Sequence, residues 1–252
     1  MPRTHIAAAA TAVALLSGAV ASARAEPVKN VVIVHGAFAD GSGWRRVAEI
    51  LGKDGYTVSV VQEPLTSLAD DVAATKRVLD LQQGPTLLVG HSYGGVVITE
   101  AGNEPNVAGL AYIAAFIPDK GESALGLLSQ MPAANDDVRA TKDGFLYIEP
   151  AAFPGDFAGD VEAALANFMS HSQPVLAKAA GGAPVTDPAW RKKKSWALIA
   201  TRDHNLNPDL QRSMAKQAGS ETIEVPASHA VYLSKPNEVA RLIERAAKAS
   251  SE

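Results

Sequence analysis

Residues 85–101 read PTLLVGHSYGGVVITEA and place a serine between two segments of different character. The apolar run 85–89 predicts a buried strand, and residues 94–102 predict a helix because their apolar side chains recur at helical spacing. Ser92 lies at the apex of the sharp turn between them. Gly90 and Gly94 flank it at two residues on either side, so strand and helix can approach without Cβ clashes. This strand, turn and helix predict that Ser92 is a nucleophile.

Outside this segment, short β-branched runs alternate with helical patterns, which is typical of a parallel sheet covered by helices. We expect strands at residues 30–35, 57–61, 85–89, 107–114, 195–201 and 222–225. We expect helices at residues 44–53, 68–82, 94–102, 208–218 and 236–249. The predicted fold class is therefore α/β, with a mostly parallel sheet flanked by helices.

Residues 119–194 interrupt the alternation, and they are rich in Ala, Pro, Gly and Asp. They contain two moderately helical stretches, at 123–130 and 160–170. We interpret the segment as a cap insertion between consecutive strands. In open parallel sheets, ligands bind beyond the carboxyl ends of the strands, so an insertion that leaves from such an end can form a lid. The alternative is that the insertion packs away from the site and has only a structural role.

The first 25 residues have the pattern of a signal peptide. Arg3 and His5 precede the small, apolar stretch 6–20, and the sequence Ala23-Arg24-Ala25 is an AxA-type cleavage site. The apolar stretch is shorter than the roughly 20 residues that span a bilayer, so we expect no membrane span. We predict a signal peptide at 1–25, export to the periplasm or secretion, and one domain at 26–252 that contains the insertion.

Composition excludes several classes of function. The chain has no cysteine, which excludes thiol nucleophiles and thiolate metal sites. Removal of the leader moves the formal charge from −4 to −6, because Arg3 and Arg24 are lost, and no basic stripe for nucleic acid remains. No histidine pair has a metal-binding spacing beside a carboxylate, so we predict no metal and no cofactor. The sequence carries no signal for the oligomeric state.

A serine nucleophile needs a base within hydrogen-bond reach and an acid that orients the base. His229 follows the last predicted strand, in a loop that can carry an imidazole over Ser92. Asp203 follows the preceding predicted strand and is the expected acid. Asp209 is the alternative acid, but it directly follows Pro208 at the start of a predicted helix, where the helix dipole stabilises a carboxylate.

Attack on a carbonyl creates an oxyanion, which backbone N–H groups can stabilise. Tyr93, directly after the nucleophile, should supply one donor. The loop after the first strand should supply the other, with Ala37 as the first candidate and Phe38 as the next. We expect His35 to hold that loop by hydrogen bonds rather than to take part in catalysis. Phe38 and Phe116 are candidate substrate-binding residues, which favours a small, largely apolar substrate.

With these residues in place, the chain resembles the α/β-hydrolase superfamily. More narrowly, it is similar to the small esterases and hydroxynitrile lyases typified by the plant methyl salicylate esterases. The resemblance spans about residues 31–242 and is carried by VHGA at 34–37, GHSYGG at 90–95 and SHAVYLSKP at 228–236. It implies the α/β-hydrolase fold, a cap in the place of residues 119–194, and the chain order Ser, acid, His, which Ser92, Asp203 and His229 follow.

That group includes two reaction classes, hydrolysis and carbon–carbon lyase chemistry. Its lyases typically carry a lysine directly after the catalytic histidine and a threonine after the histidine that ends the first strand. This chain has Ala230 and Gly36 there. Without the lysine, no positive charge stabilises released cyanide, which favours hydrolysis. We therefore predict a serine hydrolase whose partner is a small-molecule ester. The alternatives are a hydroxynitrile lyase-like activity and a non-catalytic binding protein on the same fold.

Overall fold

The structure is a computed structural model that describes residues 1, 2 and 26–251. The predicted signal peptide therefore lies almost wholly outside the described residues and stays a prediction. Within the described part of the chain, no helix is both long enough and apolar enough to cross a membrane.

Six parallel strands form the main sheet, in the spatial order β2-β1-β3-β4-β8-β9. Their bounds are β1 (Asn30–Val34), β2 (Thr57–Val61), β3 (Thr86–His91), β4 (Val107–Ile113), β8 (Ser195–Ala200) and β9 (Glu221–Val225). Each strand begins within one residue of its predicted position. Every residue of the central strand β3 is buried, as expected for a strand covered on both faces. The predicted α/β fold class is confirmed.

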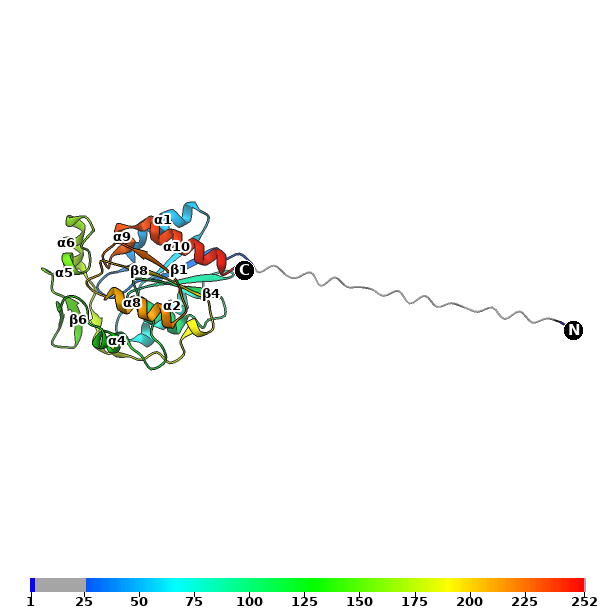
Figure 1. Ribbon diagram of the computed structural model, residues 1–252, viewed down its shortest axis with the longest axis horizontal. Coiled ribbons are helices and arrows are strands. Elements are labelled where there is room, and N and C mark those ends of the chain that lie inside the picture. The colour runs from blue at the N-terminus through cyan, green and yellow to red at the C-terminus, as the bar shows by residue number, and fades with distance from the viewer. Residues whose placement is uncertain (3–25, 252) are drawn as a thin grey trace.

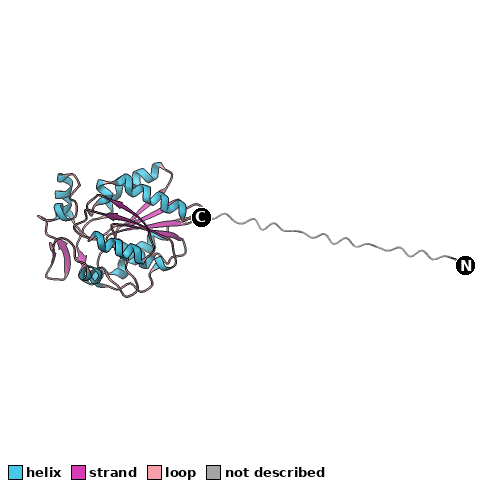
Figure 2. Ribbon diagram, viewed as in Figure 1, coloured by secondary structure: helices cyan, strands magenta, loops and turns pink. Residues whose placement is uncertain are grey.

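Helices cover both faces of this sheet (Figures 1 and 2). They are α1 (Arg45–Lys53), α2 (Leu68–Leu79), α3 (Gly94–Ala101), α8 (Pro208–Gln217) and α10 (Pro236–Ala249). In Figure 1, α1 and α10 lie above the sheet, and α2 and α8 lie below it. Capping residues fix where two of these helices begin. The Ser67 side chain caps α2 by accepting a hydrogen bond from Asp70 N. Pro236 opens α10, where its missing N–H costs nothing.

Much of the segment between β4 and β8 lies at one side of the main sheet (Figures 1 and 2). Its elements are α4 (Ala124–Gln130), β5 (Val138–Ala140), β6 (Phe145–Ile148), α5 (Phe153–Asp156), α6 (Ala163–Ser172), β7 (Leu176–Ala177), α7 (Lys178–Gly182) and the 3-10 helix η2 (Ala189–Arg191). The two predicted helical stretches correspond to α4 and α6. The antiparallel sheet β5-β6-β7 was not predicted. β4 and β8 are successive strands of the main sheet and pair parallel to each other, and this segment lies between them in the chain.

Candidate active site

The turn between β3 and α3 holds Ser92 with a backbone φ of +50°. Side chains rarely adopt this left-handed conformation, and such strain is concentrated at functional sites. A Cβ atom at Gly90 would lie 2.6 Å from the carbonyl oxygen of Gly94, so strand and helix leave no room for a side chain there. Ser92 is 5% exposed. The local sequence therefore produces the tight elbow that presents this serine at the end of β3.

His229 and Asp203 form a fully buried pair at the ends of β9 and β8. His229 Nδ1 lies 2.7 Å from Asp203 Oδ2. Three further groups donate hydrogen bonds to the carboxylate. Asn205 N and Leu206 N donate to Oδ1, and Gln211 Nε2 donates to Oδ2. Because every one of these groups donates, they hold the carboxylate in its acceptor form and leave Nδ1 of His229 as the protonated nitrogen.

Asp209, the alternative acid, lies outside this pair. Its side chain is largely exposed, and Oδ1 accepts a hydrogen bond of 2.6 Å from Arg212 Nη1 in the first turn of α8. Asn207 caps the same turn by accepting from Asp209 N. Asp209 thus has the helix-start position that the sequence indicates, and Asp203 is the carboxylate that orients His229.

The second imidazole nitrogen of His229 is buried and has no hydrogen-bond partner among the described residues. With the proton on Nδ1, this Nε2 carries a free lone pair, which is what a general base requires. None of the hydrogen bonds within residues 26–251 joins Nε2 to Ser92 Oγ. The structure therefore shows an imidazole that Asp203 orients beside the elbow. Its Nε2 is not hydrogen-bonded to Ser92.

Aromatic rings hold this base in place. The His229 ring centroid lies 4.7 Å from that of His91 and 4.9 Å from that of Phe157. His91 Nε2 also donates a hydrogen bond of 3.0 Å to the carbonyl oxygen of His229. Burial lowers the pKa of His91 well below its usual value, so this ring stays neutral beside the base. Sequence reasoning missed Phe157, which comes from the insertion and belongs to no motif.

The loop after β1 is held by His35. His35 Nδ1 donates to Gly36 O at 2.8 Å, and Glu63 N donates to His35 Nε2 at 3.1 Å. These two bonds give His35 the loop-holding position expected from the sequence. Phe38 follows with a φ of +65°. Among the turn and loop hydrogen bonds of the described chain, neither Ala37 N nor Tyr93 N is a donor, so both amides remain available to an oxyanion.

A cavity of about 90 Å³ adjoins the elbow. Its walls include the predicted nucleophile Ser92, the predicted oxyanion residues Ala37 and Tyr93, and the two substrate-binding candidates Phe38 and Phe116. The insertion supplies the apolar side chains Leu125, Leu128, Leu146, Ile148 and Leu176 to the same cavity. The insertion therefore packs over the nucleophile rather than away from it. Those leucines and the isoleucine lie in no motif, and only their apolar character marks them in the sequence.

Comparison with known proteins places this geometry in a family. A model of the alpha/beta hydrolase family matches residues 31–242. The chain belongs to the alpha/beta hydrolase family. Except for Asn30, the first residue of β1, that match spans the strands of the main sheet, and it includes all three residues of the predicted triad.

This hydrolase is 26% identical over 246 residues to a carbendazim hydrolyzing esterase of Nocardioides sp., covering 84% of this chain and 96% of that protein. A crystal structure of a pyrethroid hydrolase superposes with a TM-score of 0.77 at 22% identity, covering 89% of this chain and 100% of that one. An extracellular alpha/beta-hydrolase from a Paenibacillus species superposes with a TM-score of 0.71 at 18% identity, covering 87% and 99% of the two chains. The latter is described as a structural and functional homologue of tobacco salicylic acid binding protein 2, which confirms the predicted resemblance in fold.

A buried acidic pair, Glu63 and Asp71, lies beside the Tyr93 side chain. Tyr93 Oη donates to Asp71 Oδ2 at 2.8 Å, and Leu65 N donates to Asp71 Oδ1 at 2.8 Å. Both carboxyl oxygens of Glu63 are buried and lack a partner within the described residues. Burial, and then the neighbouring Asp71 carboxylate, raise the pKa of Glu63 well above its usual value of 4.5. Glu63 is therefore a neutral acid in the folded protein over a wider pH range than in the unfolded chain.

We expect this acid to make stability depend on pH. Between the unfolded and the folded pKa of Glu63, the folded state binds more protons, so the free energy of unfolding falls as pH rises through that window. Glu63→Gln keeps the shape without the ionisation and should flatten the fall. Urea unfolding at pH 5 and pH 8 measures the slope. The exposed Glu221→Gln variant is the matched control, and an unchanged slope in Glu63→Gln would contradict the prediction.

Proposed function

We propose that the protein is a serine hydrolase that cleaves a small carboxylic ester through an acyl-enzyme. One observation carries the proposal: the buried pair of His229 and Asp203 packs against the elbow that presents Ser92 to a cavity. Ala37 and Tyr93, whose backbone amides are the proposed oxyanion donors, line that cavity. These are the parts of a nucleophile, base, acid and oxyanion hole.

Acylation follows from this geometry. Ser92 Oγ attacks the ester carbonyl carbon, and its proton passes to the free Nε2 of His229. Asp203 stabilises the imidazolium that forms, through the hydrogen bond to Nδ1. The carbonyl oxygen becomes an oxyanion, which the N–H groups of Ala37 and Tyr93 hold. The tetrahedral intermediate then collapses, the bond to the alcohol oxygen breaks, and Nε2 gives its proton to the departing alcohol.

Deacylation repeats the steps with water. His229 Nε2 takes a proton from a water molecule that attacks the acyl carbon, and the same donors hold the second oxyanion. When this intermediate collapses, the bond to Ser92 Oγ breaks and Nε2 returns the proton to it. The products are the carboxylic acid and the free enzyme. The ring contacts of His91 and Phe157 keep the imidazole in one orientation through both halves of the reaction.

Two observations support a small ester as the substrate. The cavity at Ser92 is about 90 Å³, smaller than the 150 Å³ apolar cavity that binds benzene, so it suits a short acyl group. The residue after the base, Ala230, is fully buried and uncharged, so it supplies no positive charge for a released cyanide ion. The similar proteins described as esterases and pyrethroid hydrolases agree with ester cleavage.

A fluorophosphonate probe tests the proposal directly, because it forms a covalent bond only with an activated serine. We expect labelling on the peptide that contains Ser92, and loss of labelling in Ser92→Ala. Ser195→Ala is the matched control, since Ser195 Oγ is bonded to Ser220 Oγ at the start of β8 and should not affect labelling. A folded protein that stays unlabelled would instead support a non-catalytic binding protein.

We also propose that the protein is exported by the segment 1–25. The support is the signal-peptide pattern of the sequence, which ends at the motif Ala23-Arg24-Ala25. Expression of the full chain in a bacterium, followed by N-terminal sequencing of the periplasmic and culture fractions, measures this. A mature chain that begins near Glu26 is expected, and an uncleaved chain confined to the cytoplasm would contradict the proposal.

A further inference from the structure

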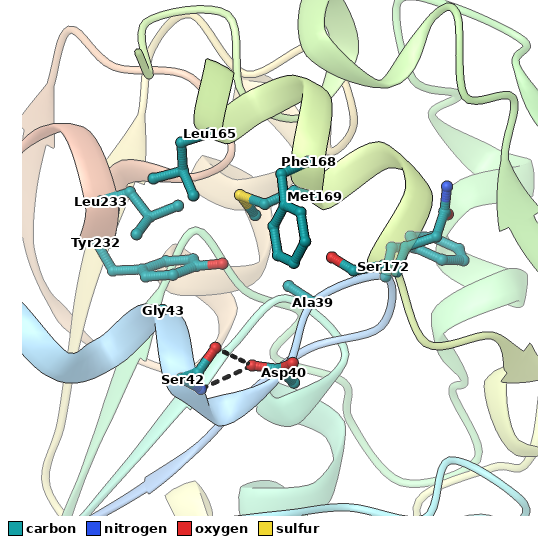
Figure 3. A pocket seen from close by; sticks show the side chains of 12 residues that line it. Ala39, Asp40, Ser42, Gly43, Leu165, Phe168, Met169, Ser172, Tyr232 and Leu233 are labelled. Carbon is teal, nitrogen blue, oxygen red and sulfur yellow. Dashed lines mark hydrogen bonds between the residues drawn. The ribbon is translucent and has the colours of Figure 1, made fainter. Parts of the chain in front are cut away.

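A second cavity, of about 260 Å³, lies beside the loop after β1 that carries Phe38, Ala39 and Asp40 (Figure 3). Helix α6 of the insertion forms one wall, with Leu165, Phe168 and Met169. The opposite wall combines the loop and the 3-10 helix η1 (Gly41–Trp44) with the short helix α9 (Val231–Ser234), which follows the catalytic histidine. Phe168 is 67% exposed, which is unusual for a phenylalanine, and it stands over the cavity. The proposed reaction assigns no role to this space.

Tyr232 supplies an unused hydrogen-bond donor to this cavity. Its side chain is fully buried and stacks on Trp44, with ring centroids 4.6 Å apart. Its hydroxyl points into the space below Phe168 (Figure 3) and has no partner among the described residues. Burial, and then the Asp40 carboxylate, raise the pKa of Tyr232, so the hydroxyl stays protonated. A buried donor left unpaired costs stability, and an acceptor atom of a ligand would satisfy it.

The position of the cavity connects it to the reaction. Phe38 lines this cavity and also the cavity at Ser92. Tyr232 follows His229 by three residues, and the His91 ring contacts both, at centroid distances of 4.8 Å and 4.7 Å. The second cavity therefore lies on the side of the catalytic base. His229 protonates the departing alcohol oxygen, so the alcohol portion of an ester extends toward that side.

We infer that this second cavity is the subsite for the alcohol portion of the ester, and that it takes a ring-sized apolar group whose acceptor oxygen bonds to Tyr232. The inference rests on the proposed ester hydrolysis. The volume of about 260 Å³ exceeds the 150 Å³ that holds benzene, so one substituted ring fits. The enzyme thus pairs a small acyl cavity with a larger alcohol cavity, and its preferred esters are those of aromatic alcohols with short acids.

Kinetics with three acetate esters test the subsite: methyl, benzyl and 4-methoxybenzyl acetate. Leu165→Trp adds bulk at the rim of the cavity, and Leu165 is 40% exposed, so the change does not disturb the core. The ratio of kcat/KM for benzyl over methyl acetate should fall at least about tenfold. Val175→Trp is the matched control, because Val175 is 39% exposed on the same insertion and does not line the cavity. It should leave the ratio unchanged.

Tyr232→Phe removes only the hydroxyl and keeps the ring on Trp44. The ratio of kcat/KM for 4-methoxybenzyl over benzyl acetate should fall about three- to tenfold, the effect of one hydrogen bond. A purely structural role of the hydroxyl would change both esters alike. Equal ratios in the wild type, Leu165→Trp and Tyr232→Phe would overturn the subsite.

A binding measurement distinguishes an error in the proposed subsite from an error in the proposed ester hydrolysis. Ligand-observed NMR measures binding of 4-methoxybenzyl alcohol to the wild type and to the Leu165→Trp and Val175→Trp variants. We expect binding to the wild type and Val175→Trp, and loss in Leu165→Trp. Equal binding by all three overturns the subsite, whatever the esterase activity. Binding that follows this expectation in a protein that cleaves none of the three esters supports the cavity and contradicts ester hydrolysis.

Discussion

Ser92→Ala is expected to lower kcat for p-nitrophenyl acetate by about a millionfold. The variant keeps the elbow, but no hydroxyl remains at the carbonyl carbon, so the acyl-enzyme cannot form. Residual activity should come only from binding and from the amides of Ala37 and Tyr93. The measurement is steady-state release of p-nitrophenol at high enzyme concentration.

Two comparisons make this result specific. Ser195→Ala changes a buried serine that is bonded to Ser220 at the opposite end of β8, and it should retain wild-type kcat. Circular dichroism of Ser92→Ala should match the wild type, because alanine is smaller than serine and tolerated wherever serine fits. A Ser92→Ala protein that keeps wild-type kcat would contradict the proposed nucleophile.

Asp203→Asn is expected to lower kcat by about ten-thousandfold, as the same change does in the type serine protease. The carboxylate accepts from Asn205 N, Leu206 N, Gln211 Nε2 and His229 Nδ1. An amide can accept at only one of its two atoms, so its NH₂ group faces a donor. Where the NH₂ group faces His229, it donates to Nδ1 and forces the imidazole proton onto Nε2, which removes the free lone pair that the reaction needs. The pH profile of kcat/KM measures the loss of the base.

Asp209→Asn is the matched control for this change. Asp209 is six residues further along the chain, and its largely exposed carboxylate contacts Arg212 on the surface of α8. A surface ion pair of this kind contributes about 0–1 kcal/mol to stability, so kcat should stay within about twofold of the wild type. A larger loss in Asp209→Asn than in Asp203→Asn would reverse the assignment of the acid.

The central sheet could be read from the sequence because its strands are covered on both faces. A strand such as β3 is a continuous apolar run, and its boundaries coincide with turn residues. The small sheet of the insertion has no such signal. β5 is three residues long and none of its residues is buried, and β7 has only two residues. Their pairing depends on contacts between distant parts of the insertion, which no local periodicity encodes.

Some residues of the candidate site could likewise be predicted from the sequence, and others could not. Ser92, Asp203 and His229 follow strands of one parallel sheet, and the carboxyl ends of such strands meet at one edge, so their order in the chain predicts their proximity. Gln211, Phe157 and the Tyr232 hydroxyl had no comparable signal in the sequence. Gln211 reaches Asp203 from inside helix α8, and Phe157 reaches His229 from the insertion. Both contacts arise from packing between elements.

By itself, the sequence determined the nucleophile turn, because strand, glycines and helix act over a few neighbouring residues and only this backbone path fits them. The sequence favoured Asp203 over Asp209 as the acid, and the tertiary structure shows the contact between Asp203 and His229. Only the tertiary structure decided where the two cavities lie. A hydrogen bond between Asp203 and His229 joins residues on different strands, and the two cavities exist only where the insertion meets the sheet. Local sequence sets backbone conformation, but distances between separate elements follow from how the whole chain packs.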